Sequence, residues 1–308
     1  MTQSRPCPVC KTDYSKARLV VAENIDPKKI SGLSFASRKE PEFMCHRLVE
    51  CPECGLVYAD QPPDEEMLAL SYHAADYDSS EEADDAARSY IEVIAVTLEA
   101  LERRDNALEI GTGTGVFLEY LAKAGFAKVE GVEPSSKAIA AAPLHRQSWI
   151  REGMFDENDY EPESFDLICC FMTMEHVRNP LAVAEAVFRL LRPGGVFVTV
   201  THDCKGWLNR MLGKRSPIID FEHMQLFSEP SIRYLFKTAG FANVSTSTFA
   251  NQYTLRYWLR LCSFPGFIKR VILAFVSALG LTNRKISLNV GNSFSAGFKP
   301  ARGKPADA

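Results

Sequence analysis

The segment LEIGTGTGVFLEYLAKAGF, residues 108–126, joins a strand-like apolar run to three alternating glycines and then to an apolar helical pattern. This order predicts a strand, a tight turn and a helix, which together hold a nucleotide-like ligand at the helix N-terminus. A dinucleotide pattern, G-x-G-x-x-G, would use Gly111 and Gly113 but needs a small residue at Val116. The third glycine is instead Gly115, so the segment fixes an α/β fold and leaves the ligand open.

Strands and helices alternate on both sides of this glycine turn, which predicts a doubly wound, Rossmann-like, mostly parallel sheet. An apolar stripe indicates a helix beginning near Ser89, and Asn179-Pro180 is typical of a helix start. The segment 287–300 predicts two strands of an antiparallel hairpin around Gly291-Asn292. The parallel strands are expected at 107–110, 128–132, 148–151, 165–171 and 196–201, and further helices at 65–70, 115–124, 136–142, 180–191 and 229–239.

Composition limits the class of protein. A length of 308 residues suits one domain with a small appendage, and a net charge of −4 argues against a nucleic-acid partner. No apolar leader is visible and there are nine cysteines, so we expect a cytoplasmic protein with free or metal-bound thiols. The apolar run 271–281 is too short to cross a bilayer and is expected to be a packed helix. Contact with a membrane surface is its alternative, because Lys269 and Arg270 precede it.

Four cysteines form two C-P-x-C pairs, Cys7 with Cys10 and Cys51 with Cys54, separated by 40 residues. Two such pairs complete the four-thiolate shell of a tetrahedral zinc, and a closed shell indicates a structural site. An iron–sulfur cluster and a redox dithiol are the alternatives for the same residues. A small N-terminal zinc-binding domain is therefore predicted.

Acidic residues at two strand ends narrow the choice of ligand. Glu133 follows Gly115 by 18 residues, at the tip of the next strand, where a carboxylate accepts both hydroxyls of a ribose. Glu109 directly precedes the glycine turn, where it would repel a pyrophosphate and favour an ammonium or sulfonium centre. Met154 and Phe155 follow the third strand and are placed to sandwich an adenine. A cationic adenosine, S-adenosylmethionine, fits this set, to which we add Phe171 at the end of the fourth strand.

Several ordered motifs resemble those of a class I S-adenosylmethionine-dependent methyltransferase: E-x-G-x-G-x-G at 109–115, Glu133, SFDLICC at 164–170, EHVRNP at 175–180 and LRPGG at 191–195. The stretch CPECGLVYADQPPDEEML resembles the zinc-binding module of the sugar C-methyltransferase group. The resemblance covers about residues 5–250. It implies methyl transfer to a small polar acceptor such as a saccharide or nucleotide-linked sugar. Methylation of oxygen or nitrogen in another metabolite, and a non-catalytic binding protein with this fold, are the alternatives.

Two Glu-His pairs compete for the role of general base. Glu175-His176 follows the fourth strand, and Glu222-His223 follows the fifth. The second pair resembles the Tyr-x-Glu-His segment of the sugar C-methyltransferases, with Asp220 at the position of the tyrosine. The resemblance therefore implies that His223 is the base and that Glu222 orients it or binds acceptor hydroxyls. His176 is the rival base, and for either histidine the alternative is simple packing.

The chain is accordingly divided into five parts. Aromatic residues at Tyr72, His73 and Tyr77 interrupt the acidic linker, and they either fold over the ligand or pack. The zinc module is expected at 1–60, the linker and lid at 61–88, the cofactor domain at 89–250, a cap with its closing hairpin at 251–300, and a tail at 301–308.

Overall fold

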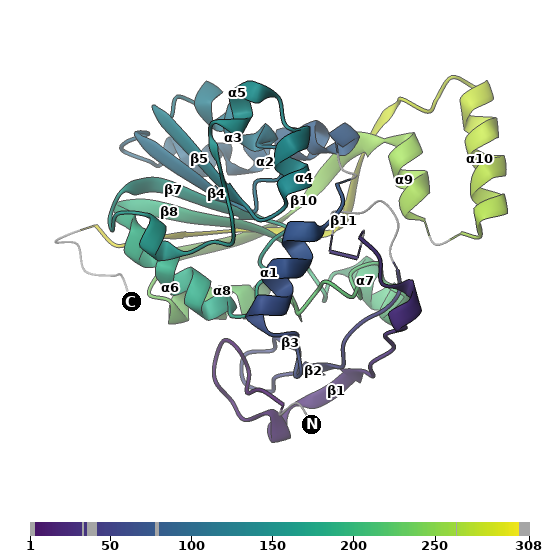
Figure 1. Cartoon of the computed structure of the whole chain (residues 1–308), viewed down its shortest axis with the longest axis horizontal. Helices are drawn as coiled ribbons and strands as arrows, with labels where there is room; N and C mark the ends of the chain where they lie inside the picture. The colour runs from purple at the N-terminus through teal and green to yellow at the C-terminus, as the bar shows by residue number, and fades with distance from the viewer. Residues whose placement is uncertain (1–3, 33, 36–41, 78–79, 263, 302–308) are drawn as a thin grey trace.

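The computed structural model describes residues 4–32, 34–35, 42–77, 80–262 and 264–301, and the predicted tail lies outside them except for Ala301. A seven-stranded sheet forms the centre of the molecule, in the order β10-β11-β8-β7-β4-β5-β6 (Figure 1). The five strands from β8 to β6 run parallel, and β10 and β11 are antiparallel, so the predicted mostly parallel, doubly wound sheet is confirmed. The strands are β4 (Asn106–Ile110), β5 (Lys128–Glu133), β6 (Ile150–Glu152), β7 (Phe165–Phe171), β8 (Leu191–His202), β10 (Ala242–Thr254) and β11 (Lys285–Phe298).

Helices cover both faces of this sheet because successive strand residues point to opposite sides. Helices α2 (Ser80–Glu99) and α3 (Val116–Lys123) pack on one face, and α6 (Pro180–Leu190) and α8 (Glu229–Thr238) pack on the other (Figure 1). In β7, Leu167 faces α2 and α3, whereas its neighbour Ile168 faces α6 and α8. The shorter helices α4 (Ser136–Ala141) and α5 (Leu144–Gln147) follow β5.

A second, four-stranded antiparallel sheet lies at the N-terminal end, in the order β1-β2-β3-β9. It contains β1 (Arg18–Val21), β2 (Leu48–Glu50), β3 (Val57–Ala59) and β9 (Gln225–Leu226). The short helices η1 (Tyr14–Lys16) and η2 (Pro27–Lys29) belong to the same region. Strand β9 comes from the middle of the chain and was not expected from the sequence. The small sheet therefore includes residues well beyond the predicted module at 1–60.

Two predicted helix boundaries are wrong. Helix α2 begins at Ser80, nine residues before the expected start, and so occupies part of the predicted linker. Its first turns are acidic and its apolar face begins late, which hides the start from a periodicity argument. Helix α1 (Glu65–Ala74) runs four residues further than expected, because its N-cap Asp64 and first-turn glutamates stabilise it.

The predicted hairpin within 287–300 is also wrong, since this segment lies in the single strand β11. Gly291 has φ +91°, and the pairing of β11 with β10 shifts register there, from Phe249 opposite Asn292 to Asn251 opposite Leu288. A Gly-Asn pair that is typical of a turn here forms a bulge, which bends the strand without reversing it. The antiparallel hairpin that closes the sheet is instead made by β10 and β11.

Two helices, α9 (Leu255–Leu261) and α10 (Gly266–Ala278), connect β10 to β11 and extend beyond the sheet (Figure 1). The expected packed helix at 271–281 is wrong, because Val276 is the one residue of α10 that is buried. In the described residues, no helix combines the length and apolarity that crossing a bilayer requires.

Candidate active site

The glycine turn between β4 and α3 is held against the neighbouring strand. The N–H groups of Gly111 and Thr112 both donate to the carbonyl oxygen of Val132, at 2.9 and 3.2 Å. Gly111 has φ +75°, and a Cβ at this position would lie 2.3 Å from Oγ1 of Thr173. Gly115, with φ +67°, is the N-cap of α3. Left-handed backbone and close approach together explain why glycine occupies these positions.

Glu133 is tied directly to this turn. Its Oε2 accepts a hydrogen bond from the N–H of Gly113 at 2.8 Å, and its Oε1 accepts one from the N–H of Ser135 at 2.9 Å. Burial raises the pKa of Glu133, and the two backbone hydrogen bonds oppose that shift. A Cβ at Gly113 would meet no atom of the described protein within 4 Å, so this side of the turn faces the cleft.

Glu109 is 5% exposed at the end of β4 and also lines the cleft. Its Oε2 accepts a hydrogen bond from Oγ1 of Thr112 at 2.5 Å. Burial raises the pKa of Glu109 to about 8, an effect that the Thr112 hydrogen bond partly offsets and the nearby Glu133 strengthens. A cationic ligand beside this buried carboxyl group would stabilise its ionised form, because a nearby positive charge lowers the pKa of a carboxyl group.

The cleft has a volume of about 1450 Å³ and runs from the glycine turn to the loop before β9 and on to α9. Met154 and Phe155 line it as predicted, and the ring of Phe155 stacks on that of Tyr160. Phe171 also borders the cleft, but its ring packs against those of Tyr90 and Phe117, each at 4.8 Å. The glycine turn, Glu133 and the aromatic wall suit the size and chemistry of an adenosine ligand.

The two competing Glu-His pairs contribute to one cluster in this cleft. Nδ1 of His176 lies 3.5 Å from Oε2 of Glu222, and the ring centroids of His176 and His223 are 4.9 Å apart. The hydroxyl of Tyr72, on α1, lies 3.2 Å from Nδ1 of His176. Glu175, by contrast, is fully buried and accepts a hydrogen bond from the N–H of His202 at 2.7 Å. Glu175 therefore joins β7 to β8 outside the cleft.

The tautomer of His223 follows from its surroundings. Its Nδ1 lies 2.8 Å from the carbonyl oxygen of Ile218, and a carbonyl oxygen only accepts hydrogen bonds. Nδ1 is therefore the protonated nitrogen of the neutral ring, and Nε2 is its unprotonated, basic nitrogen. The ligand atoms of His176, Glu222 and His223 lie within 4.8 Å of one another, so these three groups are also spaced to hold a divalent cation.

Two residues that sequence reasoning missed border the same cluster, namely His202 and Asn292. The ring centroid of His202 lies 5.6 Å from that of His223, and its Nδ1 lies 3.0 Å from Oδ1 of Asn292. Burial, and then the proximity of His223, lower the pKa of His202 to about 3, so it is neutral at physiological pH. His202 ends β8, and the rule that ligands bind at the carboxyl ends of parallel strands would have selected it.

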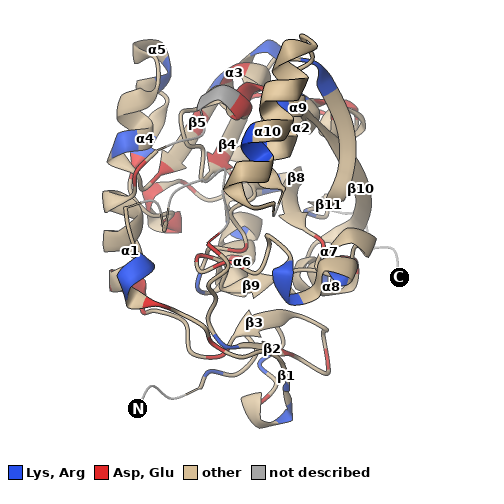
Figure 2. Cartoon of the chain, turned by 90° about the vertical axis from the view of Figure 1, so that its right-hand side faces the viewer, with Lys and Arg blue, Asp and Glu red and all other residues tan. Residues whose placement is uncertain are grey.

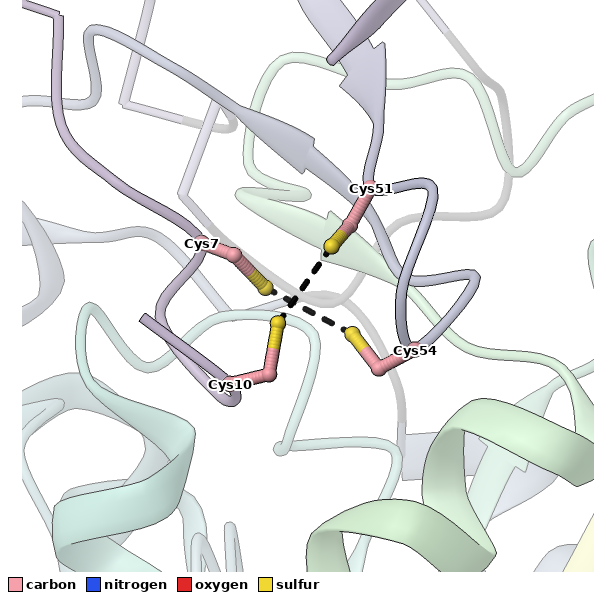
Figure 3. A group of neighbouring side chains, drawn as sticks. All are labelled: Cys7, Cys10, Cys51 and Cys54. Atoms are coloured by element: carbon pink, nitrogen blue, oxygen red, sulfur yellow. Dashed lines mark hydrogen bonds between the residues drawn. The ribbon is translucent and has the colours of Figure 1, made fainter. Parts of the chain in front are cut away.

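The four predicted metal ligands converge from two loops of the N-terminal sheet (Figure 3). The Sγ atoms of Cys7 and Cys54 are 3.5 Å apart, and those of Cys10 and Cys51 are 3.3 Å apart. The hydrogen bond between Cys7 and Cys54 lowers the pKa of Cys7 to about 5. Tetrahedral zinc with Zn–S bonds near 2.3 Å separates its sulfur ligands by about 3.8 Å, so the cluster fits zinc after a small expansion.

Other cysteines do not take part in this centre. Cys45 is buried but is not a member of the four-sulfur cluster. Cys169 and Cys170 are completely buried in β7, and burial raises the pKa of both thiols well above the usual range. They are core residues.

The sheet order, the glycine turn and the acidic strand ends define a class I S-adenosylmethionine-dependent methyltransferase. A family model described as "Methyltransferase domain" matches residues 82–246, more than half of the chain, and the chain belongs to this family. A ubiquinone biosynthesis O-methyltransferase of Sodalis glossinidius is 30% identical over 116 residues, which are 35% of this chain and 46% of that protein. The match thus spans about half the length of the curated relatives.

Solved structures with a similar fold were also found. A Thermotoga maritima S-adenosylmethionine-dependent methyltransferase, described as a possible histamine N-methyltransferase, is 22% identical with a TM-score of 0.47. The likeness covers 72% of this chain and 93% of that one. Phosphoethanolamine N-methyltransferase 2 of Haemonchus contortus, in complex with S-adenosyl-L-methionine, is 17% identical with a TM-score of 0.43, covering 70% and 57%.

Proposed function

We propose that this enzyme transfers a methyl group from S-adenosylmethionine to a hydroxyl oxygen of a small acceptor, with His223 as general base. The observation that carries the proposal is the hydrogen bond from Nδ1 of His223 to the carbonyl oxygen of Ile218, which makes Nε2 the basic nitrogen of a ring that lines the cleft. The partial match to a protein named for O-methyl transfer supports oxygen as the accepting atom.

The cofactor residues in the proposal are those at the strand ends. Glu133 would bind the ribose hydroxyls, since carboxylate oxygens keep further lone pairs besides those used by Gly113 and Ser135. Glu109 would face the cationic part of the ligand, and Met154 and Phe155 would enclose the adenine. When bound there, S-adenosylmethionine supplies an electrophilic methyl group on a cationic sulfur.

The chain's own residues orient the acceptor and remove its proton. Nε2 of His223 would take the hydroxyl proton as the acceptor oxygen displaces the thioether S-adenosylhomocysteine from the methyl carbon. Glu222 would stabilise the positive charge that develops on the ring, and Glu222 and His176 would bind the acceptor. Asp220, Asn251 and Asn292 add polar atoms to this end of the cleft, which supports a polyhydroxylated group such as a saccharide as acceptor. None of the nine cysteines, all of them among the described residues, forms a disulfide, which supports the reducing cytosol as the compartment.

The test is a set of variants assayed for S-adenosylhomocysteine release with sugar nucleotides and other hydroxylated acceptors. His223→Ala should lower kcat by roughly 10²–10⁴-fold, the usual contribution of a general base. Its affinity for S-adenosylhomocysteine should stay within about twofold of the wild-type value, because the cofactor residues are elsewhere. If His176→Ala abolishes turnover while His223→Ala retains it, the base has been assigned to the wrong histidine.

Cofactor binding is tested separately by calorimetric titration. Glu133→Ala should weaken binding of S-adenosylhomocysteine by about 1.5–3 kcal/mol, the range for hydrogen bonds to a charged group. NAD should not bind with comparable affinity. Comparable binding of NAD would contradict the assignment of the cleft.

A further inference from the structure

Helix α10 stands apart from the rest of the molecule. Figure 1 shows it at the far edge, reached from the sheet through α9, and its main contacts with other elements are with α9. Helix α9 itself is firmly attached, because Trp258 is buried and its Nε1 donates to the carbonyl oxygen of Ile286 at 2.9 Å. The pair is therefore a projecting arm on a fixed base.

One face of α10 is apolar and exposed. Phe267, Val271, Phe275 and Leu279 follow one another at intervals of four residues, which places them along one side of the helix and its C-terminal end. Each is between 55% and 68% exposed. Single exposed apolar residues are normal, but a continuous apolar stripe on a soluble surface marks a contact site.

Every charged residue of α9 and α10 is basic. Residues 251–301 include seven Lys and Arg residues and no Asp or Glu, although the whole chain has a net charge of −4. Figure 2 shows Lys and Arg residues on α9 and α10. Arg270 is exposed on α10, and Lys269 donates from Nζ to the carbonyl oxygen of Arg260 on α9. An apolar stripe bordered by positive charge complements a negatively charged lipid surface.

The cleft reaches the same arm. Tyr257, Trp258 and Leu261 of α9 line its outer end, together with Phe264 in the connection to α10 and Leu288 on β11. Phe264 is 49% exposed and lies three residues before the first member of the apolar stripe. The apolar end of the cleft therefore reaches α9 and the connection to α10.

We propose that α10 docks on the surface of an anionic lipid bilayer, with its apolar stripe among the acyl chains and its basic residues at the headgroups. The helix has 13 residues, a length of about 20 Å, and so lies along the interface instead of crossing a hydrocarbon core of about 30 Å. Docking in this orientation brings the apolar end of the cleft to the membrane. Taken with the proposed function, which this consequence presupposes, it favours an acceptor with a hydroxylated head and a hydrocarbon tail.

The test measures binding of the full-length protein to phosphatidylcholine vesicles with and without phosphatidylglycerol, by co-sedimentation. The wild-type protein should bind the anionic vesicles more tightly. Phe275→Ser should weaken that binding about tenfold, as expected for removing one buried phenylalanine. Leu144→Ser is the matched control, because Leu144 is 84% exposed on α5 and should have no effect. Arg270→Glu should weaken binding to anionic vesicles about tenfold and leave neutral vesicles unaffected.

Three outcomes would overturn the proposal: no binding to anionic vesicles, equal binding by Phe275→Ser and wild type, or an effect of Leu144→Ser as large as that of Phe275→Ser. Light scattering measures the oligomeric state and so tests the alternative that a second copy of the chain binds to the apolar stripe. A wild-type dimer that Phe275→Ser converts to a monomer, without vesicle binding, would also refute docking. All three variants should bind S-adenosylhomocysteine with the same affinity as the wild type. A negative result in the vesicle assay would therefore refute membrane docking without affecting the proposed methyl transfer.

Discussion

Binding of the cofactor should release a proton from Glu109. The carboxyl group is buried, and its pKa is raised to about 8, so about nine tenths of the protein carries this proton at pH 7. A cationic group placed against Glu109 favours the carboxylate, so binding should release about 0.9 proton at pH 7. Removing the proton from Glu109 costs about 1.4 kcal/mol of binding free energy at pH 7. Because this cost is larger at lower pH, Kd for S-adenosylhomocysteine should fall about tenfold between pH 6 and pH 7.

The assay is isothermal titration calorimetry in buffers with different ionisation enthalpies, whose slope gives the number of protons released. S-adenosylhomocysteine carries an ammonium group, and 5′-methylthioadenosine lacks the whole amino-acid part but keeps the ribose. The second ligand therefore reports any proton that Glu133 releases, and the difference between the two ligands belongs to Glu109. Glu109→Gln should abolish that difference. Equal proton release by both ligands, or an unchanged difference in Glu109→Gln, would refute the reasoning.

The remaining predictions concern the metal, the turn and the buried acid. Purified protein should contain about one zinc per chain, and Cys10→Ser should lose both the metal and several kcal/mol of stability, whereas Cys45→Ser keeps the metal in elemental analysis. Gly113→Ala should lower the free energy of unfolding, measured by denaturant titration, by about 1–2 kcal/mol, which is the cost of placing alanine in a left-handed conformation. Gly111→Ala should lower it further, because its Cβ would also clash with Thr173. Burial raises the pKa of Glu175 from 4.5 to about 7, so the folded state retains a proton that the unfolded state has lost between these values. Stability should therefore fall by about 3 kcal/mol as pH rises through that window, and Glu175→Gln should flatten the curve in urea titrations; equal slopes would contradict this cause.

The cofactor side of the site could be predicted because the carboxyl ends of parallel strands meet at one edge. Glu109 and Glu133 lie at the carboxyl ends of β4 and β5, the glycine turn follows β4, and the structure brings all three to one cleft as expected. The order of the strands along the chain and their parallel direction were sufficient to predict that these residues lie together, without any knowledge of side-chain geometry.

The acceptor side could not be predicted in the same way. His176 and Glu222 are 46 residues apart in two irregular loops, and no periodicity fixes how such loops meet. The sequence analysis treated the two Glu-His pairs as separate alternatives, whereas the cluster takes His176 from one pair and both residues of the other. For α10, the apolar pattern was sufficient to predict a helix. The pattern does not indicate whether the apolar face packs on the rest of the protein or remains exposed.

Strand β9 also has a consequence for any attempt to shorten the protein. It begins two residues after His223 and pairs with β3, which itself begins three residues after Cys54. The N–H of Ala59 further donates to the carbonyl oxygen of Met224 at 2.8 Å. A truncation that deletes the first sixty residues would thus strip β9 of its neighbour and release the loop that bears the proposed base. Strands β3 and β9 thus link the cysteine cluster to the loop that bears the proposed base, so exchanging the amino-terminal segment for another would also disturb that loop.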